Sequence, residues 1–424
     1  MNSPNPDRFS SGFYSLIAAQ FFSGLADNAL LIVGIALLTL QGREPWWVPM
    51  LKMLSITSFI VMAPWVGVLA DRWPKYKVMW VANSLKALAC VGLMLSIHPF
   101  LAFAMLGFGA ALYSPAKYGL ITELARPDQL VRANAWIEVS TVLAAVLGVV
   151  LGGWLVGAYV QSLAWTWLDW MDGVSSRLLF AFMALLSCYS FAAVLNLRVP
   201  HSGVPKREFE SHPVKLIQRF ICSNAILWQD PLGRLSLSIT TLFWGVGASM
   251  QLIVLAWAQS TLDLSLERAA YIQGCTAAGV IFGAYLASCW LKLHHAIHIG
   301  WLGFLLGGLL PLMLWVDTSH GAMWLMVVVG TVSGFFVVPM NALLQNRGHM
   351  LLTAGESIAV QNFSENVGIA VMMSIYSGLL AVEFDMDVLI LLLGLTILLV
   401  MALIFRRYYK QPRLHRTFVM NEPC

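Results

Sequence analysis

The stretch Gly67-Val-Leu-Ala-Asp-Arg-Trp-Pro-Lys-Tyr-Lys77 joins two long apolar runs of the chain, 46–70 and 78–97. Each run has about the 20 mostly apolar residues that a helix needs to cross a bilayer. The stretch between them is short and carries three basic residues, Arg72, Lys75 and Lys77. Basic residues collect in the cytoplasmic loops of membrane proteins. The stretch therefore predicts a tight cytoplasmic turn between two transmembrane helices.

The alternation of apolar runs and short polar breaks continues along the whole chain. Of the 424 residues, 59% are hydrophobic and 11% are charged, and the mean hydropathy is +0.76. A soluble protein is about 45–50% apolar and about 25% charged, so this composition indicates an all-α polytopic membrane protein. Helices are expected because lipid offers no hydrogen-bond partner to the backbone. The twelve predicted spans are 12–40, 46–70, 78–97, 99–122, 134–160, 176–197, 235–258, 267–290, 296–316, 321–345, 355–381 and 387–406.

The basic residues divide unequally between the two sides that these spans define. If both termini are cytoplasmic, three basic residues face outward, namely Arg43, Arg177 and Arg268. Nineteen face the cytoplasm: Arg8, Arg72, Lys75, Lys77, Arg126, Arg132, Arg198, Lys206, Arg207, Lys215, Arg219, Arg234, Lys292, Arg347, Arg406, Arg407, Lys410, Arg413 and Arg416. The positive-inside rule favours this orientation. The net charge of +4 thus reflects membrane topology and does not indicate a nucleic-acid partner.

The chain carries signs of an internal duplication. Its longest polar stretch, 198–234, separates a first half, 1–197, from a second half, 235–406, and a basic tail follows at 407–424. The segment Pro115-Ala-Lys-Tyr-Gly119 matches Pro339-Met-Asn-Ala-Leu343. The segment Gly67-Val-Leu-Ala-Asp-Arg-Trp-Pro-Lys75 matches Gly283-Ala-Tyr-Leu-Ala287 at a similar offset. We therefore predict two six-helix halves, a central cytoplasmic loop and a cytoplasmic tail.

The stretch 67–77 also resembles the loop pattern of the major facilitator superfamily, whose members consist of two such halves. The match includes Gly67, Asp71, Arg72 and Lys77, whereas Pro74 stands where glycine is usual. A glycine at a helix end permits close backbone approach, and an aspartate can pair with a helix N-terminus or a basic neighbour. These four residues are the predicted conformational gate. The alternative interpretation is a generic basic turn.

The sharpest candidate for substrate contact is a polar pair inside the first span. Asp27 and Asn28 stand in Phe21-Phe-Ser-Gly-Leu-Ala-Asp-Asn-Ala-Leu-Leu31, far from any polar loop. Ionisable groups in the membrane interior are costly and usually functional. Lys117, in the fourth span beside Pro115, is the expected counter-ion of Asp27. The alternative is an ion pair locked for structure alone.

Other polar residues within the predicted spans form a second group of substrate-binding candidates. Amide and carboxylate groups can bond a polar headgroup, while the apolar wall receives a chain. They can equally form interhelical hydrogen bonds, each contributing on average about 0.6 kcal/mol. The group contains Tyr113, Glu138, Gln251, Asn341, Gln345, Asn362 and Glu365.

The sequence gives little support to an enzyme. No nucleophilic triad, phosphate-binding loop or haem motif is present, so we expect neither catalysis nor a cofactor. His294 and His298 have a metal-ligand spacing, but no acid or cysteine joins them, so no metal site is predicted. The six cysteines form no CxxC pair and are interpreted as packing residues.

Several longer blocks resemble the lysophospholipid transporter family, LplT. They are 21–31, Ala110-Ala-Leu-Tyr-Ser-Pro-Ala-Lys-Tyr-Gly119, Asp230-Pro-Leu-Gly-Arg-Leu-Ser-Leu237, Gly334-Phe-Phe-Val-Val-Pro-Met-Asn-Ala-Leu-Leu-Gln345 and Ala359-Val-Gln-Asn-Phe-Ser-Glu-Asn366. The resemblance implies a flippase of the bacterial inner membrane that works without ATP. It would move lysophosphatidylethanolamine and lysophosphatidylglycerol from the outer to the cytoplasmic leaflet, where an acyltransferase restores the second chain. A monomer is the expected state.

The resemblance also implies roles for single residues. Asp27, Asn28 and Lys117 match polar cavity positions of the family. An arginine is expected in the seventh span, but the chain reads Ala248-Ser-Met-Gln-Leu252 there. Gln251 can hydrogen-bond a phosphate but adds no charge, which indicates an altered headgroup contact.

Two other functions fit the same residues. A proton-coupled exporter of amphiphilic drugs would use Asp27 or Glu365 as the proton carrier and would need a proton gradient. A scaffold that holds a lipid enzyme at the membrane would use the basic tail, which starts at Arg406.

Overall fold

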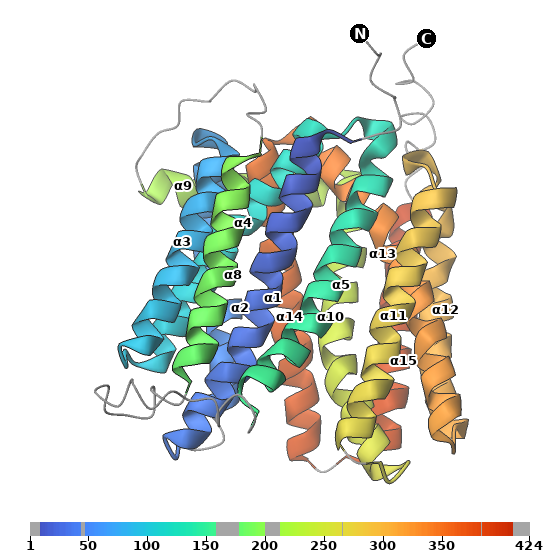
Figure 1. Ribbon diagram of the computed structural model, residues 1–424. Helices are drawn as coiled ribbons and strands as arrows, with labels where there is room; N and C mark the ends of the chain where they lie inside the picture. The colour runs from blue at the N-terminus through green and yellow to red at the C-terminus, as the bar shows by residue number, and fades with distance from the viewer. Residues whose placement is uncertain are drawn as a thin grey trace. The chain divides into compact units, whose positions relative to one another are not determined.

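The computed structural model describes residues 9–43, 47–157, 178–199, 213–264, 266–382 and 384–409. Within these ranges the chain is helical, with short turns and 3₁₀ segments between the helices (Figure 1). Parts of three predicted features lie outside the described residues: the central loop at 200–212, the tail at 410–424, and the segment 158–177 around the fifth and sixth spans. Six of the basic residues used to predict the cytoplasmic side, and Arg177 on the other side, also lie outside: Arg8, Lys206, Arg207, Lys410, Arg413 and Arg416.

The described residues of the first part of the chain form six long helices. They are α1 (Ser11–Leu40), α2 (Trp47–Arg72), α3 (Lys75–Met94), α4 (Pro99–Leu124), α5 (Leu130–Leu155) and α8 (Leu179–Leu197). A helix not predicted from the sequence, α9 (Pro213–Gln229), occupies the second part of the predicted central loop.

The later part of the chain repeats this organisation. Its helices are α10 (Pro231–Ser260), α11 (Leu266–Trp290), α12 (Trp301–Leu309), α13 (Ser319–Leu351), α14 (Ala354–Ala381) and α15 (Met386–Tyr409), and a 3₁₀ turn, Leu310–Trp315, extends α12.

Eleven of the described helices are long and apolar enough to cross a membrane. Each coincides with one of the predicted spans. The remaining predicted span, 355–381, forms helix α14. This helix is not among the eleven. The fold class predicted from the sequence is therefore confirmed.

Local chemistry explains several helix boundaries. The side chains of Ser10, Asp230 and Thr318 accept hydrogen bonds from backbone N–H groups in the first turns of α1, α10 and α13, which satisfies donors that the helix leaves unpaired. The two prolines matched in the sequence, Pro115 and Pro339, both lie inside helices, α4 and α13. Each removes one backbone hydrogen bond there.

Residue contacts divide the chain into two compact units. The first contains 1–125, 140–220 and 353–362, and the second contains 126–139, 221–352 and 363–424. The start of α14 thus belongs to the first unit and the start of α5 to the second. These units are defined by contacts rather than by position in the sequence, so the predicted domain boundaries at 197 and 235 stay a prediction.

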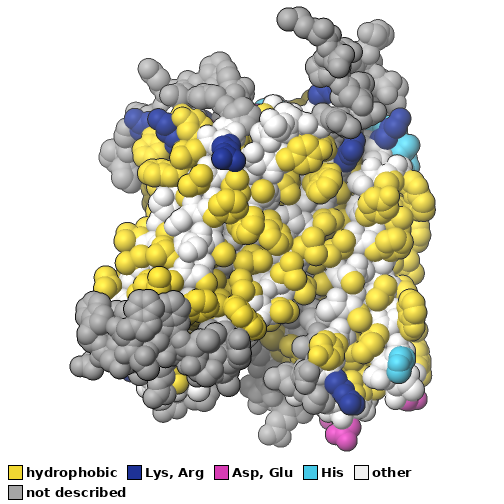
Figure 2. All heavy atoms as spheres, in the orientation of Figure 1, with side chains coloured by type: hydrophobic (Ala, Val, Ile, Leu, Met, Phe, Trp, Pro, Cys, Tyr) yellow, Lys and Arg dark blue, Asp and Glu magenta, His cyan; other side chains and the backbone are white. Residues whose placement is uncertain are grey.

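Each unit has its own apolar core. In the first, α1, α3 and α8 pack around Leu30, Phe103 and Phe182. In the second, Trp257 and Phe336 lie in a core to which α10, α13 and α15 contribute. On the face shown in Figure 2, hydrophobic side chains cover the middle of the helices, while Lys and Arg side chains lie near helix ends. This pattern suits helices surrounded by lipid.

Candidate functional site

A partly buried ion pair joins α1 and α3 in the first unit. Lys86 Nζ lies 2.6 Å from Asp27 Oδ2. The lysine side chain is 2% exposed, whereas the aspartate side chain is 29% exposed. The ammonium of Lys86 is therefore shielded, whereas the carboxylate of Asp27 is partly exposed, so a ligand can reach the carboxylate directly.

The predicted pairing of Asp27 with Lys117 is wrong, because the lysine that lies against Asp27 is Lys86. Lys117 is buried on α4, with Nζ 4.1 Å from the centroid of the Tyr118 ring. A signal for Lys86 was present in the sequence, since it is a lysine inside the apolar run 78–97 with Asn83 one helical turn before it. Sequence alone does not fix the rotation of a helix about its axis, which decides between two such lysines.

Hydrogen bonds hold both ends of the ion pair. Tyr189 Oη donates to Asp27 Oδ1 at 2.9 Å, and Lys86 Nζ donates to Ser23 Oγ at 3.1 Å. Ser23 Oγ in turn donates to Asn83 Oδ1 at 2.7 Å. Charged groups in an apolar interior need such partners, and this network keeps the carboxylate and the ammonium in fixed positions.

Two aromatic rings complete the surroundings of the lysine. Lys86 Nζ lies 5.6 Å from the centroid of the Tyr113 ring and 6.0 Å from that of Tyr189. A cation within about 6 Å of an aromatic face is attracted by the ring. The predicted site residue Tyr113 thus belongs to the same cluster as Asp27, on the lysine side.

Asn28 takes part in the packing of α1 against α5. Its side-chain amide donates to the carbonyl of Gly24 on its own helix at 2.8 Å. A Cβ at Gly148 would lie 2.8 Å from Asn28 Cβ, so this glycine allows the two helices to approach closely. The structure gives Asn28 a local hydrogen bond and does not join it to the Asp27 network.

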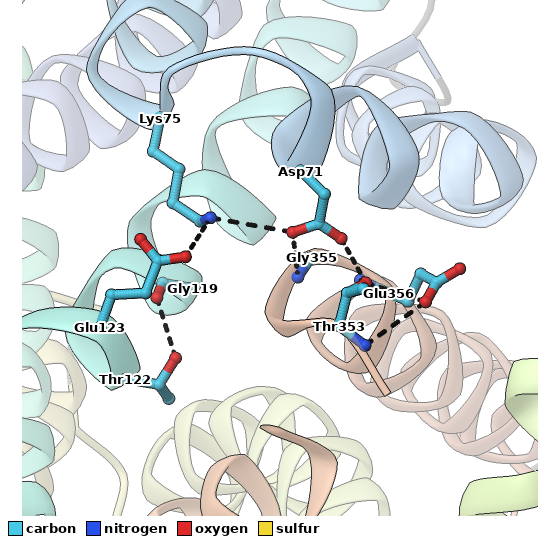
Figure 3. A network of polar contacts seen from close by, with 8 residues as sticks. All are labelled: Asp71, Lys75, Gly119, Thr122, Glu123, Thr353, Gly355 and Glu356. Carbon is cyan, nitrogen blue, oxygen red and sulfur yellow. Dashed lines mark hydrogen bonds and ion pairs between the residues drawn. The ribbon is translucent and has the colours of Figure 1, made fainter. Parts of the chain in front are cut away.

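The end of α2 forms a second polar cluster in the first unit (Figure 3). Asp71 Oδ1 accepts a hydrogen bond from the backbone N–H of Gly355 at 2.9 Å, and Thr353 donates its hydroxyl to Asp71 Oδ2. The predicted gate residue Asp71 thus binds unpaired donors at the N-terminus of α14, where a negative charge is also favoured by the helix dipole.

Thr353 and Glu356 fix this helix end. The backbone N–H of Thr353 donates to Glu356 Oε2 at 3.4 Å, and that of Glu356 donates to Thr353 Oγ1 at 3.3 Å. This reciprocal arrangement is a capping box. Glu356 also pairs with Arg219 of α9.

Lys75 extends the cluster to α4 (Figure 3). Its Nζ lies 2.5 Å from Glu123 and 3.7 Å from Asp71. A Cβ at Gly119 would lie 2.8 Å from Lys75 Cε, so a larger residue at position 119 would displace the lysine. Sequence reasoning missed Glu123 and Thr353, because their link to the 67–77 stretch exists only in three dimensions.

The other predicted gate residues lie in different surroundings. A Cβ at Gly67 would lie 2.9 Å from both the carbonyl oxygen of Gly355 and Ala359 Cβ. Gly67 therefore allows α2 to touch the first turn of α14, as the close-approach argument expected. Arg72 and Lys77 are exposed.

The remaining predicted substrate-binding residues belong to the two units as follows. In the first unit, Asn362 donates to Ser114 at 2.8 Å. In the second unit, Asn134 and Gln345 exchange two amide hydrogen bonds of 2.9 and 2.8 Å. Gln251 is exposed on α10. The rest are buried polar side chains of the second unit: Glu138, Asn341 and Glu365.

The described residues contain no candidate metal-binding cluster. No group of three or more His, Cys, Asp or Glu residues that could hold a metal ion occurs among the residues that the structure describes. The arrangement around Asp27 instead offers one accessible carboxylate, one shielded ammonium and aromatic rings, which suits binding of a polar charged group without chemical change.

Sequence comparison extends over most of the chain. A profile described as Major Facilitator Superfamily matches residues 47–371. The "Lysophospholipid transporter LplT" of Citrobacter koseri is 36% identical over 374 residues, which cover 88% of this chain and 89% of that protein. The protein of the same name from Yersinia pestis (strain Pestoides F) is 34% identical over 369 residues, covering 87% of this chain and 86% of the relative.

Several solved structures resemble this chain in fold. A crystal structure of the Major Facilitator Superfamily transporter FucP in the outward conformation has a TM-score of 0.73 at 12% identity, covering 93% of this chain and 98% of that one. A bacterial homologue of the iron transporter ferroportin in an outward-facing state has a TM-score of 0.69 at 15% identity, covering 95% of this chain and 100% of that one.

Proposed function

We propose that this chain, which belongs to the major facilitator superfamily and within it to the lysophospholipid transporter (LplT) family, carries lysophospholipids across the bacterial inner membrane. As a member of this superfamily it is a multi-pass secondary transporter and not an enzyme. Its substrates are lysophosphatidylethanolamine and lysophosphatidylglycerol. They move from the outer to the cytoplasmic leaflet by alternating access without ATP, and a cytoplasmic acyltransferase then consumes them.

The observation that carries the proposal is the 36% identity to LplT over 88% of the chain. At the site, the support is the Asp27–Lys86 pair, since an ionisable group among membrane helices is a functional candidate by default. The carboxylate is the exposed member. It can receive the ammonium of an ethanolamine headgroup, whereas Lys86 is shielded and holds the carboxylate in place.

The cluster around Asp71 supplies a latch in this proposal. The hydrogen bonds from Gly355 and Thr353 to Asp71 tie α2 to the start of α14. These bonds would have to break for the two helix ends to separate, and they can form again without a covalent step. Both termini and this latch lie on the cytoplasmic side in the proposal, as the distribution of basic residues favours.

The test is uptake of labelled lysophosphatidylethanolamine into spheroplasts that make the protein, compared with spheroplasts that lack it. We expect protein-dependent uptake that persists when a protonophore collapses the proton gradient. Asp27→Asn should reduce uptake at least tenfold if the carboxylate binds the headgroup in the rate-limiting step. Lys292→Met, which changes an exposed loop lysine, is the matched control and should leave uptake unchanged. Absence of protein-dependent uptake would refute the lysolipid assignment.

One observation favours a second candidate, the proton-coupled exporter of amphiphilic drugs. The partly exposed carboxylate of Asp27 lies among membrane helices, where ionisable residues often mark proton pathways. The protonophore separates the two functions, because the exporter loses transport in its presence and the facilitative lipid carrier does not.

A further inference from the structure

A pocket in the second unit lies between α10, α14 and α15, outside every residue assigned to transport above. Its volume is about 410 Å³, within the range of roughly 300–1,000 Å³ that is typical of small-molecule sites. Its walls come from the first turns of α10, the middle of α14 and the last turns of α15.

The lining changes from charged to apolar along the helices. Arg234 and Arg407 line the pocket with Trp228 and Tyr408, near the start of α10 and the end of α15. Leu242 lies eight residues beyond Arg234 on α10, which is about 12 Å along the axis at a rise of about 1.5 Å per residue. The pocket thus extends from a cationic, aromatic end to an apolar end.

Met372 of α14 and Val400 of α15 belong to the apolar end. Val400 lies seven residues before Arg407, or about 10 Å along α15. Because α10 and α15 run in opposite directions, the start of α10 and the end of α15 together form the charged end of the pocket, and both helices become apolar away from it. An amphiphile whose charged group and chain lie along the helix axes matches this gradient.

The charge at the polar end is positive. No aspartate or glutamate is found among the described residues that line the pocket. The nearby carboxylate of Asp230 is bound by Arg347, with contacts of 2.5 and 3.1 Å, and caps α10 through the N–H of Gly233. An anion therefore complements the pocket better than a cation or a zwitterion does.

We propose that this pocket binds one anionic phospholipid of the surrounding membrane as a resident ligand rather than as cargo. The phosphate lies between Arg234 and Arg407, since guanidinium groups bind phosphate with paired, charge-assisted hydrogen bonds. Trp228 and Tyr408 lie at the headgroup level, where aromatic residues are common in membrane proteins. One acyl chain packs on Leu242 and Met372. Basic pockets between transmembrane helices are known to bind anionic lipid headgroups.

The occupant is a lipid rather than a free phosphate, because a free phosphate has no use for the apolar part of the lining. A small anion would contact only the arginine end and leave the apolar walls to water. A lipid that is part of the bilayer removes that apolar surface from water as well. The pocket also contains neither Asp27 nor Lys86, so this proposal stands apart from the transport function.

The experiment measures lipid retained by the purified full-length protein in native mass spectrometry, after equilibration with phosphatidylglycerol or with phosphatidylethanolamine. We expect one phosphatidylglycerol per protein, held at least fivefold more than phosphatidylethanolamine. Arg407→Gln should lower the retained phosphatidylglycerol about fivefold, the effect expected for one basic residue near a lipid headgroup. Arg406→Gln is the matched control, because it removes the neighbouring exposed arginine, which does not line the pocket.

A second variant tests the apolar end. Met372→Trp fills the pocket and should lower retention of phosphatidylglycerol by a similar factor, without changing the charge. Thermal unfolding of each variant in detergent checks that it is folded, and the preference of the unaltered protein for phosphatidylglycerol can be measured whether or not a variant folds.

Three outcomes would overturn the proposal. The first is equal retention of the two lipids by the unaltered protein. The second is an equal loss in Arg406→Gln and Arg407→Gln, which would indicate a diffuse basic surface. The third is displacement of phosphatidylglycerol by millimolar glycerol phosphate or inorganic phosphate, which would indicate a site for a soluble anion.

Discussion

Replacing Asp27 and replacing Lys86 should each destabilise the protein, and the two losses of stability should differ. At 2.6 Å, the attraction of two unit charges is about 6 kcal/mol at an effective dielectric constant of about 20. Part of this is offset by the desolvation of both groups, and loss of one partner from a buried pair typically costs about 3–5 kcal/mol. The two side chains differ in burial, with lysine 2% and aspartate 29% exposed.

We therefore expect Asp27→Asn to be the more damaging change, at about 4 kcal/mol, because it leaves a shielded ammonium without its carboxylate. Lys86→Met should cost about 2 kcal/mol, since the remaining carboxylate reaches solvent and keeps the hydrogen bond from Tyr189. The double variant should be no worse than Lys86→Met alone, because no unpaired charge remains. This corresponds to a coupling of about 4 kcal/mol between the two sites.

The assay is reversible unfolding in mixed micelles with increasing dodecyl sulfate, followed by circular dichroism. Lys292→Met, an exposed lysine, is the control and should change the free energy of unfolding by less than about 0.5 kcal/mol. A larger loss in Lys86→Met than in Asp27→Asn would refute the reasoning from burial. Additive losses in the double variant would show that the two groups do not form a stabilising pair.

Two further changes test other contacts by the same unfolding assay. Gly67→Ala places a Cβ 2.9 Å from the carbonyl oxygen of Gly355 and should cost about 1–3 kcal/mol through overpacking. The control is Gly153→Ala, which has no atom within 4 Å of the added Cβ and should be neutral or slightly stabilising. Equal effects at the two glycines would contradict a close contact at Gly67. Asn134→Leu leaves the buried amide of Gln345 unpaired and should cost about 1–3 kcal/mol. Changing both residues to leucine should recover part of that loss. A double variant whose loss equals the sum of the losses in Asn134→Leu and Gln345→Leu would argue against the reciprocal amide pair.

The sequence predicted the helices well because the bilayer imposes a simple requirement. A span must be apolar for about 20 residues, so the runs are visible without knowledge of their neighbours. Helix α9 was missed because a short amphipathic helix lacks that signal and was interpreted as part of a polar loop. Gly67 was singled out for close helix approach, and its surroundings at Gly355 agree with that role.

The partners of the polar residues were harder to predict. Lys86 and Lys117 both stand in apolar runs, and Asp27 could be matched to either until the helices were oriented. The contacts of Asp71 with Thr353 and Gly355 join residues more than 280 positions apart. No local pattern links them, since a capping box identifies a helix start but not the side chain that binds there.

The sequence by itself determined the class of protein, the positions of the membrane helices and the family, because hydropathy and motif blocks are properties of short segments. Only the tertiary structure decided which charges meet, which helix end Asp71 caps and where a cationic, apolar pocket forms between α10, α14 and α15. The physical reason is that hydropathy acts on each residue through the solvent around it. Ion pairs, caps and pockets instead depend on the rotation and spacing of helices that are distant in sequence.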